Sequence, residues 1–198
     1  MPKKLQTEEI IYSKEVIEFI TVANEFCNIM ENLNTQSREE FINNIYKILT
    51  LIQLKSVLLP KIEFSSGFGT ESFVNEADWH FFDNAVSEKL GSFEIYSNLR
   101  EPLNPESSSE VTLSECIADT YQDLKDLTQN YQISSPDAIL QSIAECKTNF
   151  EQYWGPRIML VIREFHLLIY GNSNLSDDSN EVEKADNSKN NWLNDIFE

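Results

Sequence analysis

The chain has 198 residues, of which 41% are hydrophobic and 11% aromatic, so it can bury the core of one globular domain. Thirty-three acidic residues against 15 basic ones give a formal net charge of -18, which opposes binding to nucleic acid and to anionic lipid surfaces. The sequence has no apolar stretch long enough to span a membrane, no signal-peptide pattern and only three cysteines, which predicts a cytoplasmic protein with reduced thiols and no membrane or nucleic-acid partner.

Helical periodicity dominates the first part of the chain. Five glycines and six prolines fall between long segments whose apolar residues recur every three or four positions, which favours an all-α domain. The first predicted helix follows Ser13 and places these residues on one apolar face: Val16, Phe19, Ile20, Ala23, Phe26, Cys27 and Met30. The second begins at Ser37, with Glu40 placed for a capping box, and ends before Pro60.

The middle of the chain alternates loops and helices. Residues 61–75 are predicted to form an exposed loop, because periodicity is lost among serines and glycines. A third helix is expected from about residue 76 to Leu90, with Ala77, Phe81, Phe82, Ala85 and Val86 turned inward and Gly91 ending it. Residues 93–111 are predicted to form a long connection, and no strand is assigned to it.

Three further helices are predicted before a polar tail. The fourth starts at Thr112 with a second capping box, and the fifth starts at Ser135 with proline at its first position. Gly155 and Pro156 are expected to break or kink the path before the sixth helix, 157–170, which is apolar on almost every side. Such a helix belongs in the middle of a bundle. The expected organisation is therefore one bundle of about six helices over 1–171, followed by a disordered acidic tail over 172–198.

A ladder of like charges follows the fourth helix. Its members, spaced by four, four and three residues, are Glu115, Asp119, Asp123 and Asp126. Such a ladder costs a few tenths of a kcal/mol per pair unless it is neutralised. The apolar sixth helix carries Arg157 and Arg163, and a desolvated guanidinium needs a carboxylate. We therefore predict that Asp119 or Asp123 pairs with one of these arginines across the bundle.

Two interpretations of this ionic cluster stay open. It is either a structural ion pair with a solvated acidic face, or a ligand site made by Asp119, Asp123, Arg157, Arg163 and His166. His166 is interpreted first as a satisfied core or boundary residue. No catalytic residue, metal ligand or cofactor is assigned, although a carboxylate-bound Mg²⁺ at Asp119 and Asp123 remains an alternative.

The end of the chain has its own apolar pattern. After an acidic stretch, apolar residues stand at positions i, i+1, i+4 and i+5: Trp192, Leu193, Ile196 and Phe197. This spacing is typical of a helix that docks into a groove, either on another protein or back on its own bundle. A tail end without a docking role is the alternative.

Parts of the sequence resemble a known bacterial family, catalogued as domain of unknown function 5063. The resemblance rests on the stretch Tyr12 to Phe19, on Tyr121 to Asp126, on Asn149 to Arg157 and on His166 to Gly171. It covers about residues 12–171 and implies a compact helical, cytoplasmic protein, but it brings no activity, cofactor or catalytic residue. Pro156 departs from the polar residue usual at that position in the family.

Two functions from different classes follow as expectations. The first is a non-enzymatic protein–protein interaction or adaptor module, supported by the negative charge, the lack of a catalytic motif and the apolar tip of the tail. The second is an enzyme of phosphoanion chemistry that uses a small molecule or a divalent metal at the Asp/Arg/His cluster between helices. An acidic mimic of nucleic acid is a third, and it would need carboxylates spread over more than one helix.

Overall fold

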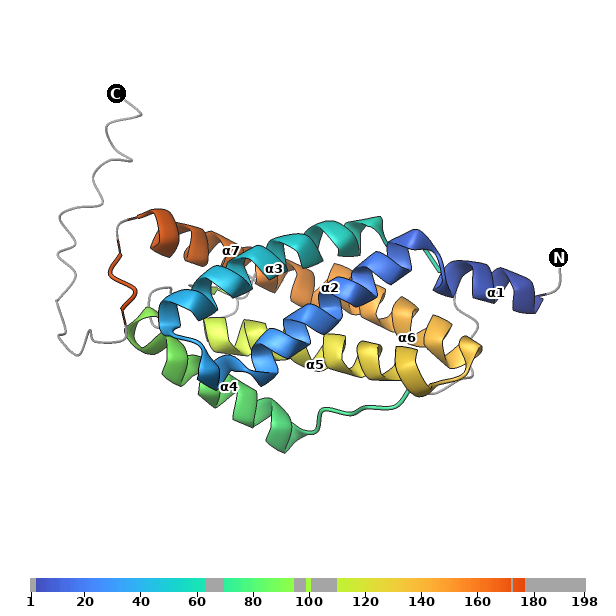
Figure 1. Ribbon diagram of the computed structural model, residues 1–198, viewed down its shortest axis with the longest axis horizontal. Helices are drawn as coiled ribbons and strands as arrows, with labels where there is room; N and C mark the ends of the chain where they lie inside the picture. Colours follow the sequence, from blue (N-terminus) through green and yellow to red (C-terminus); the bar gives the residue numbers. More distant parts are fainter. Residues whose placement is uncertain (1–2, 63–69, 95–98, 101–109, 172, 177–198) are drawn as a thin grey trace, which may run out of the picture.

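The computed structural model describes residues 3–62, 70–94, 99–100, 110–171 and 173–176. Within these ranges the chain forms an elongated all-α bundle (Figure 1), which confirms the predicted fold class. The helices are α1 Lys3–Ile11, α2 Lys14–Glu31, α3 Arg38–Leu58, α4 Glu76–Leu90, α5 Leu113–Ile133, α6 Pro136–Asn149 and α7 Gly155–Tyr170. Two short strands, β1 Leu99–Arg100 and β2 Glu110–Val111, pair antiparallel in the connection to which no strand was assigned.

Helix α1 was not predicted from the sequence. It lies at one end of the bundle against α6 (Figure 1) and has no apolar periodicity of its own. Ile11 at its end is fully buried, and the Tyr131 hydroxyl donates a hydrogen bond of 2.8 Å to the Ile11 carbonyl. Because a nine-residue helix is marginal in isolation, contacts of this kind explain why it forms here.

The next two helices agree with their predicted patterns. All seven apolar residues predicted for the face of α2 are buried. The capping boxes at Ser37 of α3 and at Thr112 of α5 are both present, and a third one, at Asn75 of α4, was not predicted. Each capping box satisfies backbone N–H groups that a helix start leaves open, so these boundaries are determined locally.

Helix α4 buries only part of the face that the sequence indicated. Val86 is buried as predicted, together with Leu90, and Phe82 and Ala85 are partly buried against the core, whereas Ala77 and Phe81 are exposed. The reason is that α4 lies at the edge of the bundle and packs mainly against α5, so only a narrow stripe is covered. Gly91 ends the helix as predicted, with a φ of 57° that favours glycine.

The chain stays helical through Gly155 and Pro156, where a break or kink was predicted. A π-helical turn, Phe150–Trp154, joins α6 to α7, and the Gly155 N–H bonds to the carbonyl of Phe150. A proline inside a regular α-helix clashes with the carbonyl four residues before it. The wider turn accommodates Pro156 at the start of α7 without ending the helix.

Helix α7 packs against α3 and α5. Its core residues include Ile158, Val161 and Phe165, whereas Met159 and Leu167 are exposed on its outer side. Its apolar character is therefore divided between the core and the surface. Within the described residues, no helix combines the length and the apolar content needed to cross a membrane.

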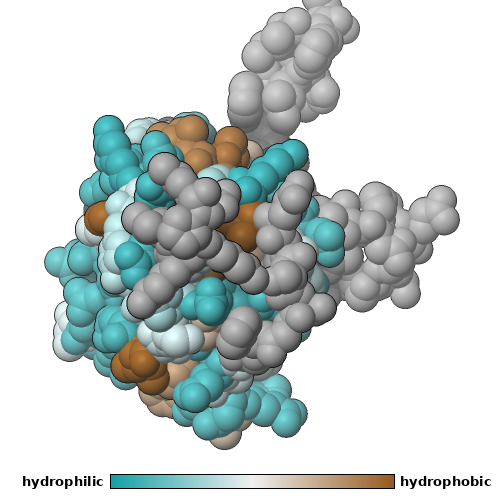
Figure 2. All heavy atoms as spheres, turned by 90° about the vertical axis from the view of Figure 1, so that its right-hand side faces the viewer, coloured by the Kyte–Doolittle hydropathy of each residue, from teal (hydrophilic) through white to brown (hydrophobic). Residues whose placement is uncertain are grey.

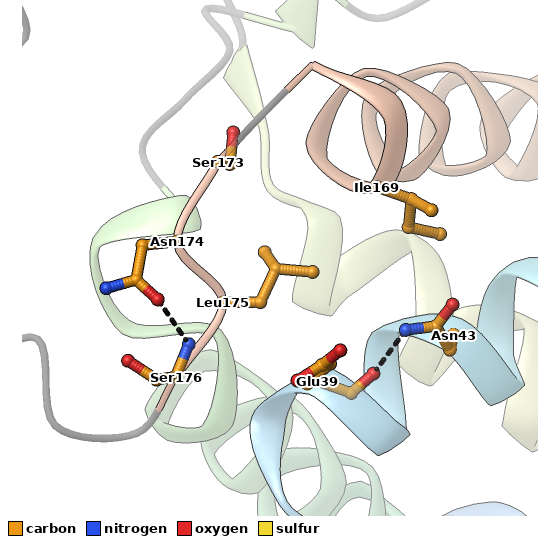
Figure 3. Close-up of a pocket in the computed structure, with 7 residues that line it drawn as sticks. All are labelled: Glu39, Asn43, Ile169, Ser173, Asn174, Leu175 and Ser176. Atoms are coloured by element: carbon orange, nitrogen blue, oxygen red, sulfur yellow. Dashed lines mark hydrogen bonds between the residues drawn. The ribbon is translucent and has the colours of Figure 1, made fainter.

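A short segment after α7 lies against the bundle (Figure 3). In Ser173–Ser176, Leu175 is buried, and Arg38 Nη1 of α3 donates a hydrogen bond of 3.1 Å to the Ser176 carbonyl. This segment therefore ends beside the first residue of α3. Residues 177–198, for which disorder was predicted, lie outside the described residues.

Candidate functional site

A polar cluster forms where α4, α5 and the π-helical turn meet. Asp119 of α5 accepts hydrogen bonds from Trp79 Nε1 (3.0 Å) and from the Tyr153 hydroxyl (2.9 Å), and it forms an ion pair with Arg157. The Arg157 guanidinium also donates to the Tyr153 hydroxyl and lies 4.2 Å from the centre of its ring. The predicted pairing of an α5 carboxylate with an arginine of the last helix is confirmed. Trp79 and Tyr153 had not been assigned to it.

Hydrogen bonds occupy almost all of the acceptor positions of the Asp119 carboxylate. Its side chain and that of Arg157 are only 11% and 12% exposed. Burial raises the pKa of Asp119, and the hydrogen bond from Tyr153, the charge of Arg157 and the bond from Trp79 counteract this increase. In return, burial and the nearby Asp119 raise the pKa of Tyr153 to about 12. The group is therefore a charged pair with a neutral phenol.

Asp123 lies one turn further along α5 and is less well satisfied. Asn149 Nδ2 donates to its Oδ1 over 3.1 Å, whereas Oδ2 is buried and has no hydrogen-bond partner. Burial raises the pKa of Asp123 to about 6, and nearby Asn149 and Trp154 counteract part of this increase. The Trp154 Nε1–H is also buried without a hydrogen bond of good geometry. Asp123 is thus the carboxylate of the cluster whose charge is most costly to bury.

We expect stability to depend on pH through Asp123. Because its carboxyl binds a proton more tightly in the folded state, the free energy of unfolding should fall as pH rises from about 4 to about 6, by about 2 kcal/mol. The raised pKa of Asp119 acts in the same direction. Urea unfolding of Asp123→Asn across this pH range should show a clearly smaller decrease. Asp137→Asn, at an exposed position of α6, is the control, and equal decreases in both variants would contradict the assignment.

Hydrogen bonds, and no ion pair that the described residues form, hold Glu115 and Asp126 of the acidic ladder. Glu115 accepts the Thr112 N–H in its capping box. Asp126 accepts the backbone N–H groups of Phe73 and Val74, at 2.6 and 3.0 Å, and so holds the described end of the 61–75 loop along α5. Each ladder member therefore has a different structural partner, and the predicted cation lies at Asp119 alone among the described residues.

Arg163 and His166 do not join this cluster. Arg163 is largely exposed and pairs with Glu164, its neighbour in sequence. His166 Nδ1 and the hydroxyl of Tyr46 on α3 are 2.9 Å apart in a hydrogen bond, and the His166 ring also contacts Tyr170. The structure thus brings together Asp119, Asp123 and Arg157, whereas Arg163 pairs within α7 and His166 lies between α7 and α3.

A pocket lies at the opposite end of α7 (Figure 3). Glu39 and Asn43 of α3, Ile169 of α7 and the segment Ser173–Ser176 line it, with Leu175 pointing between the helices. Asn43 donates its side-chain hydrogen bond to the Glu39 carbonyl of its own helix. The pocket walls are polar and lack a cluster of chemically reactive groups. Across the described ranges, no three His, Cys, Asp or Glu side chains are grouped to hold a metal ion.

The outer side of α3 is unusually apolar for a surface helix. Four aliphatic side chains, between 45% and 59% exposed, form what we term the α3 apolar face: Leu51, Leu54, Val57 and Leu58. Their spacing of three and four residues places them on one stripe, opposite the core residues Ile48 and Ile52. Hydrophobic surface gathers at the upper edge of Figure 2, the side on which α3 lies in Figure 1.

The α3 apolar face also has a local charge opposite to that of the chain. Residues 41–62 contain three lysines and no aspartate or glutamate, in a chain of net charge -18. Lys47 is exposed, and Lys55 pairs with Glu18 of α2 at 2.7 Å. Lys14 also lies 3.8 Å from Glu18, so this acidic neighbour is shared by two lysines. The face is therefore apolar with a positive border.

Two of the four stretches that carry the family resemblance, Tyr121 to Asp126 and Asn149 to Arg157, contribute to the polar cluster. Asn149 bonds to Asp123, and Tyr153 and Arg157 bond to Asp119. A family model, described as a domain of unknown function (DUF5063), matches residues 10–171. The chain belongs to the DUF5063 family. The matched residues end at Gly171, directly after α7.

A solved crystal structure supports the same fold. The crystal structure of protein BF1032 from Bacteroides fragilis is 31% identical in sequence and covers 81% of this chain and 96% of its own, with a TM-score of 0.73. No protein with curated annotation matches the chain. The comparisons therefore establish the family and the fold of the DUF5063 domain.

Proposed function

We propose that this DUF5063 protein is a non-enzymatic interaction module that binds an amphipathic, acidic helix of a partner protein through the α3 apolar face. The observation that carries the proposal is the stripe of four exposed aliphatic side chains with a positive border in a strongly acidic chain. Clustered exposed apolar side chains mark interaction surfaces. Anchors spaced by three and four residues suit a helix laid along them.

Charge favours a partner of this type. The long-range field of a chain with net charge -18 repels acidic proteins in general. An acidic partner would therefore bind where lysines reverse the local sign, with apolar residues supplying affinity and charge supplying orientation. The polar cluster at Asp119 fits a structural role instead, since Arg157 is held by Asp119 and Tyr153.

Affinity capture with the full chain tests this proposal. Leu54→Glu combined with Leu58→Glu should reduce retention of a partner at least tenfold, because two carboxylates would replace the central anchors. Ile133→Glu is the matched control, since Ile133 is 63% exposed on α5, outside the face. The captured protein is then identified, purified and titrated. Identical retained proteins and affinities for all three chains would contradict the proposal.

A ligand-binding enzyme is the second candidate. The observation that favours it is the buried Asp123 Oδ2, which has no hydrogen-bond partner beside the Asp119–Arg157 pair. Buried polar atoms of this kind often mark a ligand position. A thermal-shift measurement with Mg²⁺ and inorganic phosphate tests it, and stabilisation that Asp123→Asn abolishes would favour this function over the first.

A further inference from the structure

We propose that residues 192–197 of this chain dock on the α3 apolar face and compete there with the partner. This inference rests on the proposed function, because it assigns regulation to the same face. The segment carries Trp192, Leu193, Ile196 and Phe197 at a helical spacing. Its apolar residues thus match a surface stripe whose anchors are also three and four residues apart.

The charges of the two surfaces are complementary. Residues 172–198 hold seven acidic and two basic residues, and Asp195 and Glu198 flank the apolar positions. The region of α3 that carries the face has only lysines as charged residues between 41 and 62. The rest of the chain carries a net negative charge, the same sign as that of the segment. Electrostatics therefore favours the α3 apolar face over the rest of the surface.

Residues 192–197 can reach the α3 apolar face from the point where the described chain ends. The Ser176 carbonyl is bonded to Arg38, the first residue of α3, and Figure 3 shows this segment against the helix. From Arg38 to Leu58 the helix is about 30 Å long at 1.5 Å per residue. The fifteen residues 177–191 can extend over about 50 Å. The connection is thus long enough to reach any part of the face.

Covalent linkage makes weak docking effective. A tethered segment of this length has an effective concentration of about 1 mM. If residues 192–197 bind with a dissociation constant of about 0.1 mM, they reduce the apparent affinity of a competing partner about tenfold. The C-terminal segment would then act as a built-in competitor that a tighter-binding partner displaces.

Disulfide trapping in the full chain tests the docking directly. Leu54→Cys with Leu193→Cys should form a disulfide at least tenfold faster than Ile133→Cys with Leu193→Cys, the matched pair outside the face. The native cysteines Cys27, Cys116 and Cys146 are all buried, so they are shielded from the new thiols. The product should be monomeric, with a rate independent of protein concentration. Adding Ile196→Asp and Phe197→Asp should slow it to the control rate.

Two results would overturn the inference. Equal rates for the two cysteine pairs would show that the segment does not prefer the face. A dimeric product that forms faster at higher protein concentration would assign the face to a second copy of the chain instead.

The capture assay separates this inference from the proposed function. Ile196→Asp with Phe197→Asp, in a chain with the native face, should increase the affinity for a captured partner about tenfold. If capture depends on Leu54 and Leu58 but the disulfide forms at the control rate, the docking is wrong and the proposed function stands. If the disulfide forms rapidly but capture never depends on the face, the docking stands and the proposed function is wrong.

Discussion

Replacing Gly155 with alanine should destabilise the fold by about 3 kcal/mol, a cost typical of forcing atoms into a packed site. A Cβ at this position would lie inside contact distance of the Phe150 carbonyl oxygen and 2.8 Å from Cδ2 of its ring. The carbonyl belongs to the π-helical turn and accepts the Gly155 N–H, so it cannot move without loss of that bond. Urea unfolding at pH 7 measures the change.

The control for this prediction lies in the same turn. Gln152→Ala removes an exposed side chain and should change the free energy of unfolding by less than about 0.5 kcal/mol. If Gly155→Ala were as stable as this control, the close approach of Phe150 to Gly155 would not limit the turn. Because the turn also holds Tyr153 beside Asp119, the Gly155 variant should in addition disturb the polar cluster.

Arg157→Met should cost about 3 kcal/mol, the lower part of the range for removing one partner of a buried ion pair. The change leaves the Asp119 carboxylate, 11% exposed, without its cation. Trp79 and Tyr153 still donate to it, which keeps the loss from being larger. Combining Arg157→Met with Asp119→Asn should recover part of the lost stability, because the uncompensated charge is then removed.

Arg163→Met is the matched control on the same helix. Arg163 is 66% exposed, whereas the side chain of its partner Glu164 is only 6% exposed, so one half of this pair remains hydrated and the pair contributes less than a fully buried one. Its replacement leaves the Glu164 carboxylate without its cation and should cost about 1 kcal/mol, clearly less than the loss for Arg157→Met. Equal losses for the two arginine variants in urea unfolding at pH 7 would contradict the view that Asp119 and Arg157 form the structural pair.

These variants also bear on how the molecule works. If Arg157 and Gly155 matter mainly for stability, two of the stretches that carry the family resemblance, Tyr121 to Asp126 and Asn149 to Arg157, preserve a junction between α5, α6 and α7. The interaction surface would then lie on α3, outside those quoted stretches. Stability measurements on the cluster and binding measurements on the α3 apolar face are therefore independent tests.

The sequence predicted that an ion pair would form at the candidate site, but not which residues would form it. The α5 ladder and the arginines of the last helix indicated an ion pair, because like charges on one face and a desolvated guanidinium each need a partner. Which residues met depended on helix packing, so Asp119 paired with Arg157 while Arg163 pairs with Glu164. Trp79 and Tyr153 gave no sequence signal for their roles, since aromatic residues usually indicate core packing.

The sequence by itself determined the all-α class, the apolar stripe of α2 and the capped starts of α3 and α5, because these depend on interactions within a few residues. Only the tertiary structure decided that α1 forms, that Phe81 faces outward and that the helix continues past Pro156. It also decided that four aliphatic side chains of α3 remain uncovered. The physical reason is that periodicity shows which faces are apolar, whereas burial depends on which neighbouring helices are present to cover them.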